Sequence, residues 1–124
     1  MKDKKFLVID DDELVRTMIC SVLRNRKCTV YEAVNGEEGV KLAKEHSPNF
    51  VITDMLMPDK EGIQTIIEIK ALNPDIKIIA MSGGGEKKNM TFLEMAKKVG
   101  AHKLLKKPFK PSELFETIKE LLDK

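Results

Sequence analysis

Residues 6–12 read Phe6-Leu7-Val8-Ile9-Asp10-Asp11-Asp12, four apolar residues followed by three carboxylates. The apolar run has the length and composition of a strand that is buried on both faces of a parallel sheet. Similar short runs recur at 28–31, 50–52, 76–81 and 103–105, and segments with apolar residues at helical spacing separate them. This alternation predicts five strands and five helices.

The intervening segments also carry helix-end signals. Asp12 is suited to cap the first helix, and Gly100 to end the fourth. The expected helices are a first with its apolar stripe over Leu14–Leu23, a second between Asn35-Gly36 and Ser47-Pro48, a third over about Lys60–Leu72, a fourth from Lys87 or Lys88 to Val99, and a fifth beginning at Pro111. Strict alternation of strand and helix predicts an α/β fold, with helices on both faces of the parallel sheet and right-handed crossovers.

The composition indicates one globular domain over residues 1–124, because 42% of the residues are hydrophobic and the length suits a single core. No apolar run approaches the roughly 20 residues of a membrane span. The net charge of +2 does not argue for nucleic-acid binding. Cys20 and Cys28 are expected as buried, reduced thiols of a cytoplasmic protein. His46 and His102 lack partners at metal-ligand spacing and are expected at the surface.

Polar side chains follow four of the five predicted strands. Asp10 and Asp11 follow the first strand, Asp54 the third, Ser82 the fourth and Lys107 the fifth. Because the carboxyl ends of parallel strands meet at one sheet edge, these side chains should lie close together. Two carboxylates about 4 Å apart repel by roughly 4 kcal/mol at an effective dielectric near 20. Mg²⁺ prefers such oxygen ligands and would relieve this repulsion.

This set of groups indicates a phosphoryl-transfer site. Asp54 would attack phosphorus, Asp11 and Asp54 would hold the metal, and Ser82 and Lys107 would receive phosphoryl oxygens. Each residue alone has a less specific explanation, as part of an acidic helix N-terminus, a turn or a solvated surface. Their combination at one edge favours the functional interpretation.

These residues resemble the motifs of the response-regulator receiver family, the phospho-acceptor domains of two-component signalling. The matching stretches are Phe6–Asp12, Thr53–Pro58, Ala80–Gly83 and Lys106–Phe109, and the likeness extends from Phe6 to Leu122. The resemblance implies a flavodoxin-like, doubly wound (βα)5 fold with strand order 2-1-3-4-5.

The resemblance also implies a role for each acidic residue. Asp54 would be the phosphorylated aspartate, and Asp10 and Asp11 the acidic pair. Asp11 would bind Mg²⁺ (or Mn²⁺) directly, Asp10 mostly through water, and the backbone carbonyl of Leu56 would be a further ligand. 

Two other positions match residues that the family uses for switching. Ser82 stands where the family has its switch Ser or Thr, and Lys107 where it has its lysine. The Lys107–Pro108 peptide bond is expected to be cis.

Three features depart from the family pattern. Leu104 stands where the switch aromatic is usually found, so output is expected through backbone shifts instead. The segment 82–107 is slightly longer than is typical and begins with Gly83-Gly84-Gly85. Leu56 and Gly84 occupy the positions that tune dephosphorylation, and neither can orient water with a side-chain hydrogen bond. A slow to intermediate autophosphatase is therefore predicted.

The resemblance implies that a sensor histidine kinase or phosphotransfer protein, or a small acyl phosphate, donates the phosphoryl group. The domain would catalyse its own phosphorylation and dephosphorylation, without turning over an external substrate. A downstream protein would bind the face made by the fourth helix, fifth strand and fifth helix, where residues 97–111 carry six lysines and no acid. An acidic docking partner is expected, and the domain would be a monomer or weak dimer.

Three alternatives stay open from the sequence. The chain could be a receiver cut from a larger regulator or hybrid kinase, or an interaction module that works without phosphorylation. A phosphatase of the haloacid-dehalogenase type also forms an aspartyl phosphate. However, its nucleophile follows the first strand, which would leave Asp54 without a role.

Overall fold

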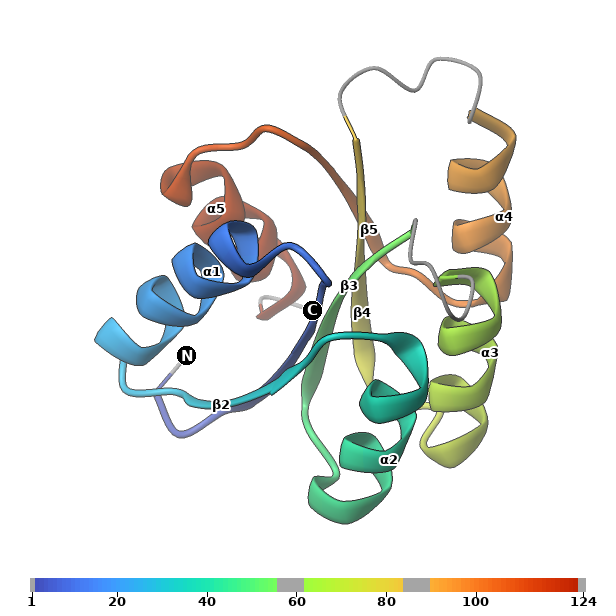
Figure 1. Ribbon diagram of the computed structural model, residues 1–124, viewed down its shortest axis with the longest axis horizontal. Coiled ribbons are helices and arrows are strands. Elements are labelled where there is room, and N and C mark those ends of the chain that lie inside the picture. The colour runs from blue at the N-terminus through green and yellow to red at the C-terminus, as the bar shows by residue number, and fades with distance from the viewer. Residues whose placement is uncertain (1, 56–61, 84–89, 123–124) are drawn as a thin grey trace.

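The computed structural model describes residues 2–55, 62–83 and 90–122, and within these ranges five strands alternate with five helices (Figure 1). In chain order the elements are β1 (Lys5–Ile9), α1 (Glu13–Asn25), β2 (Thr29–Ala33), α2 (Gly36–His46), β3 (Phe50–Asp54), α3 (Gly62–Leu72), β4 (Lys77–Ser82), α4 (Met90–Val99), β5 (Lys103–Lys106) and α5 (Pro111–Leu122). The predicted alternation is confirmed. No helix in the described part of the chain has the length and apolar character that crossing a membrane requires.

The five strands form one parallel sheet in the order β2-β1-β3-β4-β5, as predicted. β1 and β3 are central neighbours, with Ile9 paired to Thr53. On the other side of β3, Asp54 pairs with Met81 of β4. This register ends β1, β3 and β4 at nearly the same level, so the residues that follow them share one edge.

Helices α1 and α5 cover one face of the sheet, and α2, α3 and α4 cover the other (Figure 1). Successive strand residues point to opposite faces, so each strand supplies both layers and reads as an unbroken apolar run. Beneath α1 and α5 lie Phe6, Val8, Ile52, Ile79 and Met81, and beneath α2, α3 and α4 lie Leu7, Ile9, Val51, Ile78 and Ala80. Burying one such large apolar side chain contributes about 1.5–3 kcal/mol.

The helix ends explain where the elements begin and stop. The Asp12 side chain caps α1 by accepting the backbone N–H groups of Leu14 at 2.9 Å and Val15 at 3.3 Å, as predicted. The backbone φ of Gly100, directly after α4, is +129°, a value that residues other than glycine rarely adopt. This confirms the predicted C-cap.

Close approach of two backbones explains another glycine, at the start of α3. A Cβ atom added to Gly62 would lie 2.6 Å from the Cα of Met55, directly after β3. The Gly62 N–H donates to the Met55 carbonyl at 3.2 Å. Position 62 therefore admits no side chain while β3 and α3 keep this spacing.

The sequence predicted the wrong degree of burial for two residues. Leu14, in the first turn of α1, was expected in the buried stripe of the first helix but is 83% exposed and lines a surface groove with Pro108 and Phe109. His102 was expected at the surface but is half-buried, and its Nδ1 accepts the Ile78 N–H at 3.0 Å. The His102 side chain therefore takes part in the hydrogen bonding beside β4.

Several further expectations are confirmed. Cys20 and Cys28 are both buried. Burial, followed by the charge of Glu32, raises the pKa of the Cys20 thiol from 9.0 to about 11, so the thiol stays protonated at neutral pH. The Lys107–Pro108 bond is cis. The predictions for Leu56 and for Gly84 fall outside the described residues.

Candidate functional site

Asp10, directly after β1, is held by four hydrogen bonds and is fully buried. Its backbone N–H donates to the Ala33 carbonyl at 3.1 Å, and its carbonyl accepts Arg16 Nη1 at 2.8 Å. One carboxylate oxygen accepts the Asp12 N–H at 2.9 Å, and the other accepts Lys107 Nζ at 2.8 Å. A carboxylate fixed in this way has one orientation, turned toward the end of β5.

The structure brings three predicted acidic residues together. Asp54 ends β3 and is 6% exposed, whereas Asp11 is exposed. One carboxylate oxygen from each of Asp10, Asp11 and Asp54 lies within 4.8 Å of the others. We refer to these three residues as the acidic cluster.

Lys107 balances part of the negative charge of the acidic cluster. Its Nζ lies 2.8 Å from Asp10 Oδ2 and 3.5 Å from Asp54 Oδ2. Burial by itself would lower the pKa of Lys107. The hydrogen bond that Lys107 donates to Asp10 and the charge of Asp54 outweigh burial, so the pKa of Lys107 lies above its usual 10.5. The ammonium group is therefore charged at neutral pH.

Ser82, the last residue of β4, is 5% exposed and is hydrogen-bonded to the backbone of Lys107. Its carbonyl accepts the Lys107 N–H at 2.7 Å. The predicted hydroxyl and ammonium groups thus come from neighbouring strand ends. Of the predicted site residues, only the backbone carbonyl of Leu56 falls outside the described part of the chain.

The donor set fits a hard divalent cation. Three carboxylates supply oxygen ligands only, which suits Mg²⁺, and the exposed side of Asp11 leaves room for the waters that this ion keeps. With one ammonium group against three carboxylates, the cluster has an excess of negative charge that a cation would reduce. Asp10, Asp11 and Asp54 are the residues that could hold it.

Arg16 is a site residue that the sequence did not reveal. Besides the bond to the Asp10 carbonyl, its Nε lies 3.1 Å from Glu32 Oε1, and Glu32 also pairs with Arg24 at 3.2 Å. A single arginine on an amphipathic helix is ordinary, so no sequence signal marks it. Only the packing of α1 beside β2 shows that it fixes the backbone at the acidic cluster.

An apolar groove of about 420 Å³ adjoins the site, and the sequence did not predict it either. Leu14, Val15 and Met18 of α1 form one wall, and Pro108 and Phe109 form the other. Asp12 and Lys107 also line it, so the groove opens next to the acidic cluster.

Comparison with known proteins shows a consistent likeness. Residues 6–119 match the family model described as response regulator receiver domain. The chain is 34% identical to chemotaxis protein CheY of Thermotoga maritima over 119 residues, covering 95% of this chain and 97% of that protein. It is 26% identical to sporulation initiation phosphotransferase F of Bacillus subtilis over 122 residues, covering 98% and 96%.

A solved structure agrees with these matches. The CheY-like response regulator receiver domain protein from Methanospirillum hungatei superposes with a TM-score of 0.89 at 28% identity. The match covers 98% of this chain and 95% of that one.

Proposed function

The chain belongs to the response regulator receiver domain family, and on this premise we propose that it is a signalling receiver that accepts a phosphoryl group on Asp54. Receiver domains of two-component systems work with histidine kinases or phosphotransfer proteins and with downstream targets. The observation that carries the proposal is the acidic cluster, with Lys107 Nζ 2.8 Å from Asp10 and 3.5 Å from Asp54.

In the proposed reaction a carboxylate oxygen of Asp54 attacks the phosphorus of a phosphohistidine while the bond between phosphorus and the imidazole nitrogen breaks. The electron pair of that bond goes to the nitrogen, which leaves as neutral imidazole when its other nitrogen carries a proton. Lys107 and Ser82 would each receive a phosphoryl oxygen from adjacent strand ends. Asp54 becomes an acyl phosphate, which water later hydrolyses.

Asp10, Asp11 and Asp54 would hold Mg²⁺, or Mn²⁺ in its place. The bound ion would neutralise charge on the transferring phosphoryl group. The residues themselves orient the nucleophile. The Asp12 N–H and the Arg16 guanidinium fix Asp10, which in turn holds the Lys107 ammonium beside Asp54.

The apolar groove supports a protein as the phosphoryl donor. A donor that reaches Asp54 has to cover the adjacent surface, where Leu14 is 83% exposed. Contiguous exposed apolar surface beside a site is typical of protein interfaces. We propose that a sensor histidine kinase or phosphotransfer protein covers Leu14, Met18 and Phe109 during transfer, whereas a small acyl phosphate would not need them.

We propose that output uses the α4–β5–α5 face. Of the six lysines in 97–111, Lys103 pairs with Glu120 at 2.7 Å and Lys107 belongs to the site. Lys97, Lys98, Lys106 and Lys110 are exposed, and they would attract an acidic partner. Reversing the charge of Lys97 and Lys98 should weaken partner binding at low salt. Unchanged binding would remove the acidic-partner proposal.

The proposed setting is the cytoplasm, where Cys20 and Cys28 stay reduced. The receiver would act as a single domain, a monomer or weak dimer, that contacts proteins but not nucleic acid or membrane.

The decisive experiment treats the protein with acetyl phosphate and Mg²⁺ and measures the intact mass. We expect a stoichiometric, acid-labile adduct that Asp54→Asn abolishes and that Asp75→Asn, an exposed aspartate at the opposite sheet edge, leaves intact. Turnover of many phosphates per protein would favour the phosphatase alternative. Absence of both an adduct and a response to beryllofluoride would favour a module that works without phosphorylation.

The adduct should also persist. Leu56 and Gly84 offer no side-chain hydrogen bond to an attacking water, so we expect slow to intermediate hydrolysis in Mg²⁺. Loss of the adduct within seconds would contradict this part of the proposal.

A further inference from the structure

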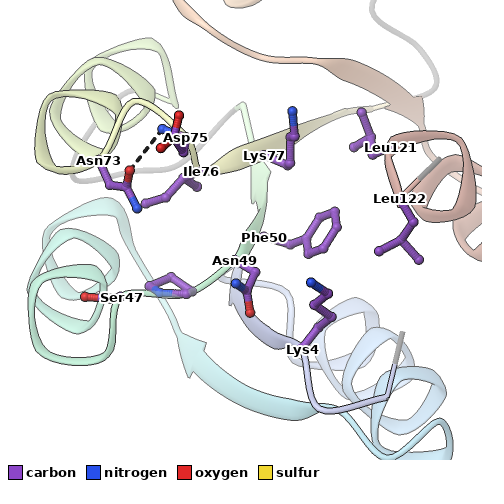
Figure 2. Close-up of a pocket in the computed structure, with 11 residues that line it drawn as sticks. Lys4, Ser47, Asn49, Phe50, Asn73, Asp75, Ile76, Lys77, Leu121 and Leu122 are labelled. Carbon is purple, nitrogen blue, oxygen red and sulfur yellow. Dashed lines mark hydrogen bonds between the residues drawn. The ribbon is translucent and has the colours of Figure 1, made fainter. Parts of the chain in front are cut away.

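A second groove lies at the amino edge of the sheet, opposite the acidic cluster, and has a volume of about 250 Å³ (Figure 2). The loops before β3 and β4 form two of its sides, and Leu121 and Leu122 at the end of α5 form a third. Phe50 lies at its centre in Figure 2. The groove shares no lining residue with the apolar groove beside Lys107.

Two asparagine side chains in this groove have fixed orientations. Asn49 Oδ1 accepts the Lys5 N–H at 2.8 Å, and Asn73 Oδ1 accepts the Asp75 N–H at 3.0 Å. Because each side-chain oxygen accepts a hydrogen bond from a backbone N–H, the other end of each side chain is the amide nitrogen, which can donate hydrogen bonds. These two NH₂ groups are hydrogen-bond donors presented by an ordered backbone.

The backbone around Asn49 is itself held on both sides. Its N–H donates to the Lys5 carbonyl at 2.9 Å, and its carbonyl accepts the Lys77 N–H at 3.0 Å. One residue thus links the starts of β1, β3 and β4. A site built on such a segment loses little conformational freedom when a ligand binds, which favours binding.

The charge of the groove is positive. Lys4 and Lys77 line it, and the part of the chain that the structure describes shows no ion pair for either. In Figure 2 the Lys4 ammonium and the Asn49 amide both lie toward the middle of the groove. Asp75 is the single acidic lining residue, and its carboxylate lies at the rim beside Asn73.

Nearby Lys70 lies close enough to Lys77 for the two positive charges to interact. Desolvation first, and then the charge of Lys77, lower the pKa of Lys70, although Asp75 acts in the opposite direction. Its Nζ donates to the Pro74 carbonyl at 2.9 Å. An anion bound next to Lys77 would relieve this repulsion.

We propose that the amino-edge groove binds a small organic oxyanion, a carboxylate or phosphate ester, through Lys4, Lys77 and the side-chain amides of Asn49 and Asn73. Its volume lies below the roughly 300–1,000 Å³ of pockets for drug-sized ligands, so the ligand is small. Phe50 and Leu121 supply an apolar wall for a short organic body. This site does not depend on phosphorylation of Asp54.

The test is a titration of the ¹⁵N-labelled protein, in EDTA and without Mg²⁺, with inorganic phosphate and with phenyl phosphate. We expect saturable shifts of the amide signals of Lys5, Phe50 and Lys77, and none for Asp11 or Lys107. Phenyl phosphate should bind more tightly, because its ring contacts the apolar wall. A third titration uses benzoate, which carries a carboxylate on the same ring. Tighter binding of benzoate than of phenyl phosphate would identify the carboxylate as the preferred anion.

A matched pair of variants separates specific binding from net charge. Lys4→Gln with Lys77→Gln should weaken binding about tenfold, the loss of charge-assisted hydrogen bonds. Lys41→Gln with Lys106→Gln removes the same charge at exposed positions elsewhere and should change little. Lys4→Gln alone, at an exposed position, keeps the test valid if the double variant unfolds. Absence of saturable shifts, or equal weakening in both pairs, would overturn the proposal.

Discussion

The two edges of one sheet use their polar groups in opposite ways. At the amino edge, Asn49 satisfies backbone groups of Lys5 and Lys77 and carries no charge. At the carboxyl edge, three carboxylates lie within 4.8 Å of one another and share one ammonium group, that of Lys107. The Asn49 hydrogen bonds at the amino edge therefore stabilise the fold by themselves, whereas the carboxylates at the carboxyl edge keep an excess of negative charge that a cation would reduce. The amino edge thus helps to hold the sheet together, while the carboxyl edge carries the acidic cluster and Lys107.

Removing one ammonium group from each edge should give the largest contrast. Lys107→Met leaves buried Asp10 without its charged partner, and we expect a loss of about 3 kcal/mol in unfolding free energy without Mg²⁺. Lys77→Met removes a lysine without an ion pair among the described residues and should cost less than about 0.5 kcal/mol. Urea unfolding measures both. Equal losses would mean that the two edges do not differ electrostatically.

Adding Mg²⁺ should stabilise the folded protein, and only through binding at the carboxyl edge of the sheet. At about one hundred times its dissociation constant, the ion should raise the unfolding free energy by about 2.7 kcal/mol. Asp11→Asn, which removes one exposed proposed ligand without disturbing Lys107, should reduce this gain at the same concentration. Thermal melting in Mg²⁺ and in EDTA gives the comparison, and an undiminished gain in the variant would exclude Asp11 as a ligand.

Asn49→Ala tests the amino edge. It leaves the Lys5 N–H without its acceptor, and we expect a loss of about 1 kcal/mol that is the same with and without Mg²⁺. Asn49→Asp keeps an acceptor oxygen and should retain most of the stability, which makes it the matched control. A Mg²⁺-dependent loss in Asn49→Ala would show that the two edges are coupled.

The smallest expected effect is on the pH dependence of stability at alkaline pH, where Lys107 and Lys70 should contribute with opposite signs. The pKa of Lys107 is raised, so its contribution to stability is complete below pH 10.5 and is lost as pH rises through the folded-state pKa. The pKa of Lys70 is lowered, so its protonation opposes folding at neutral pH, and this cost disappears as pH rises toward 10.5. Unfolding free energies of Lys107→Met and Lys70→Met, each measured against the parent protein from pH 8 to 11, should therefore diverge in opposite directions.

The sequence predicted the carboxyl edge better than the amino edge. Parallel strands end together, so Asp10, Asp54, Ser82 and Lys107 could be grouped from their positions after predicted strands. The amino-edge groove combines loops far apart in the chain, and an asparagine before a strand is too common to identify its partners. Periodicity likewise identifies the buried side of a helix but not where the sheet beneath it stops. This is why Leu14 was misplaced. The bond from Arg16 to the Asp10 carbonyl was missed because a single arginine on an amphipathic helix carries no signal of its partner.

The two core layers have a consequence for how mutations combine. Val8 and Ile9 are adjacent in β1, yet one packs beneath α1 and α5 and the other beneath α2, α3 and α4. Side chains that share no partners have nearly additive effects on stability, whereas side chains within one layer are coupled. The sheet therefore divides the protein into two halves that can diversify independently. Residues in the core under one helical layer can be substituted while the residues packed under the other layer stay unchanged.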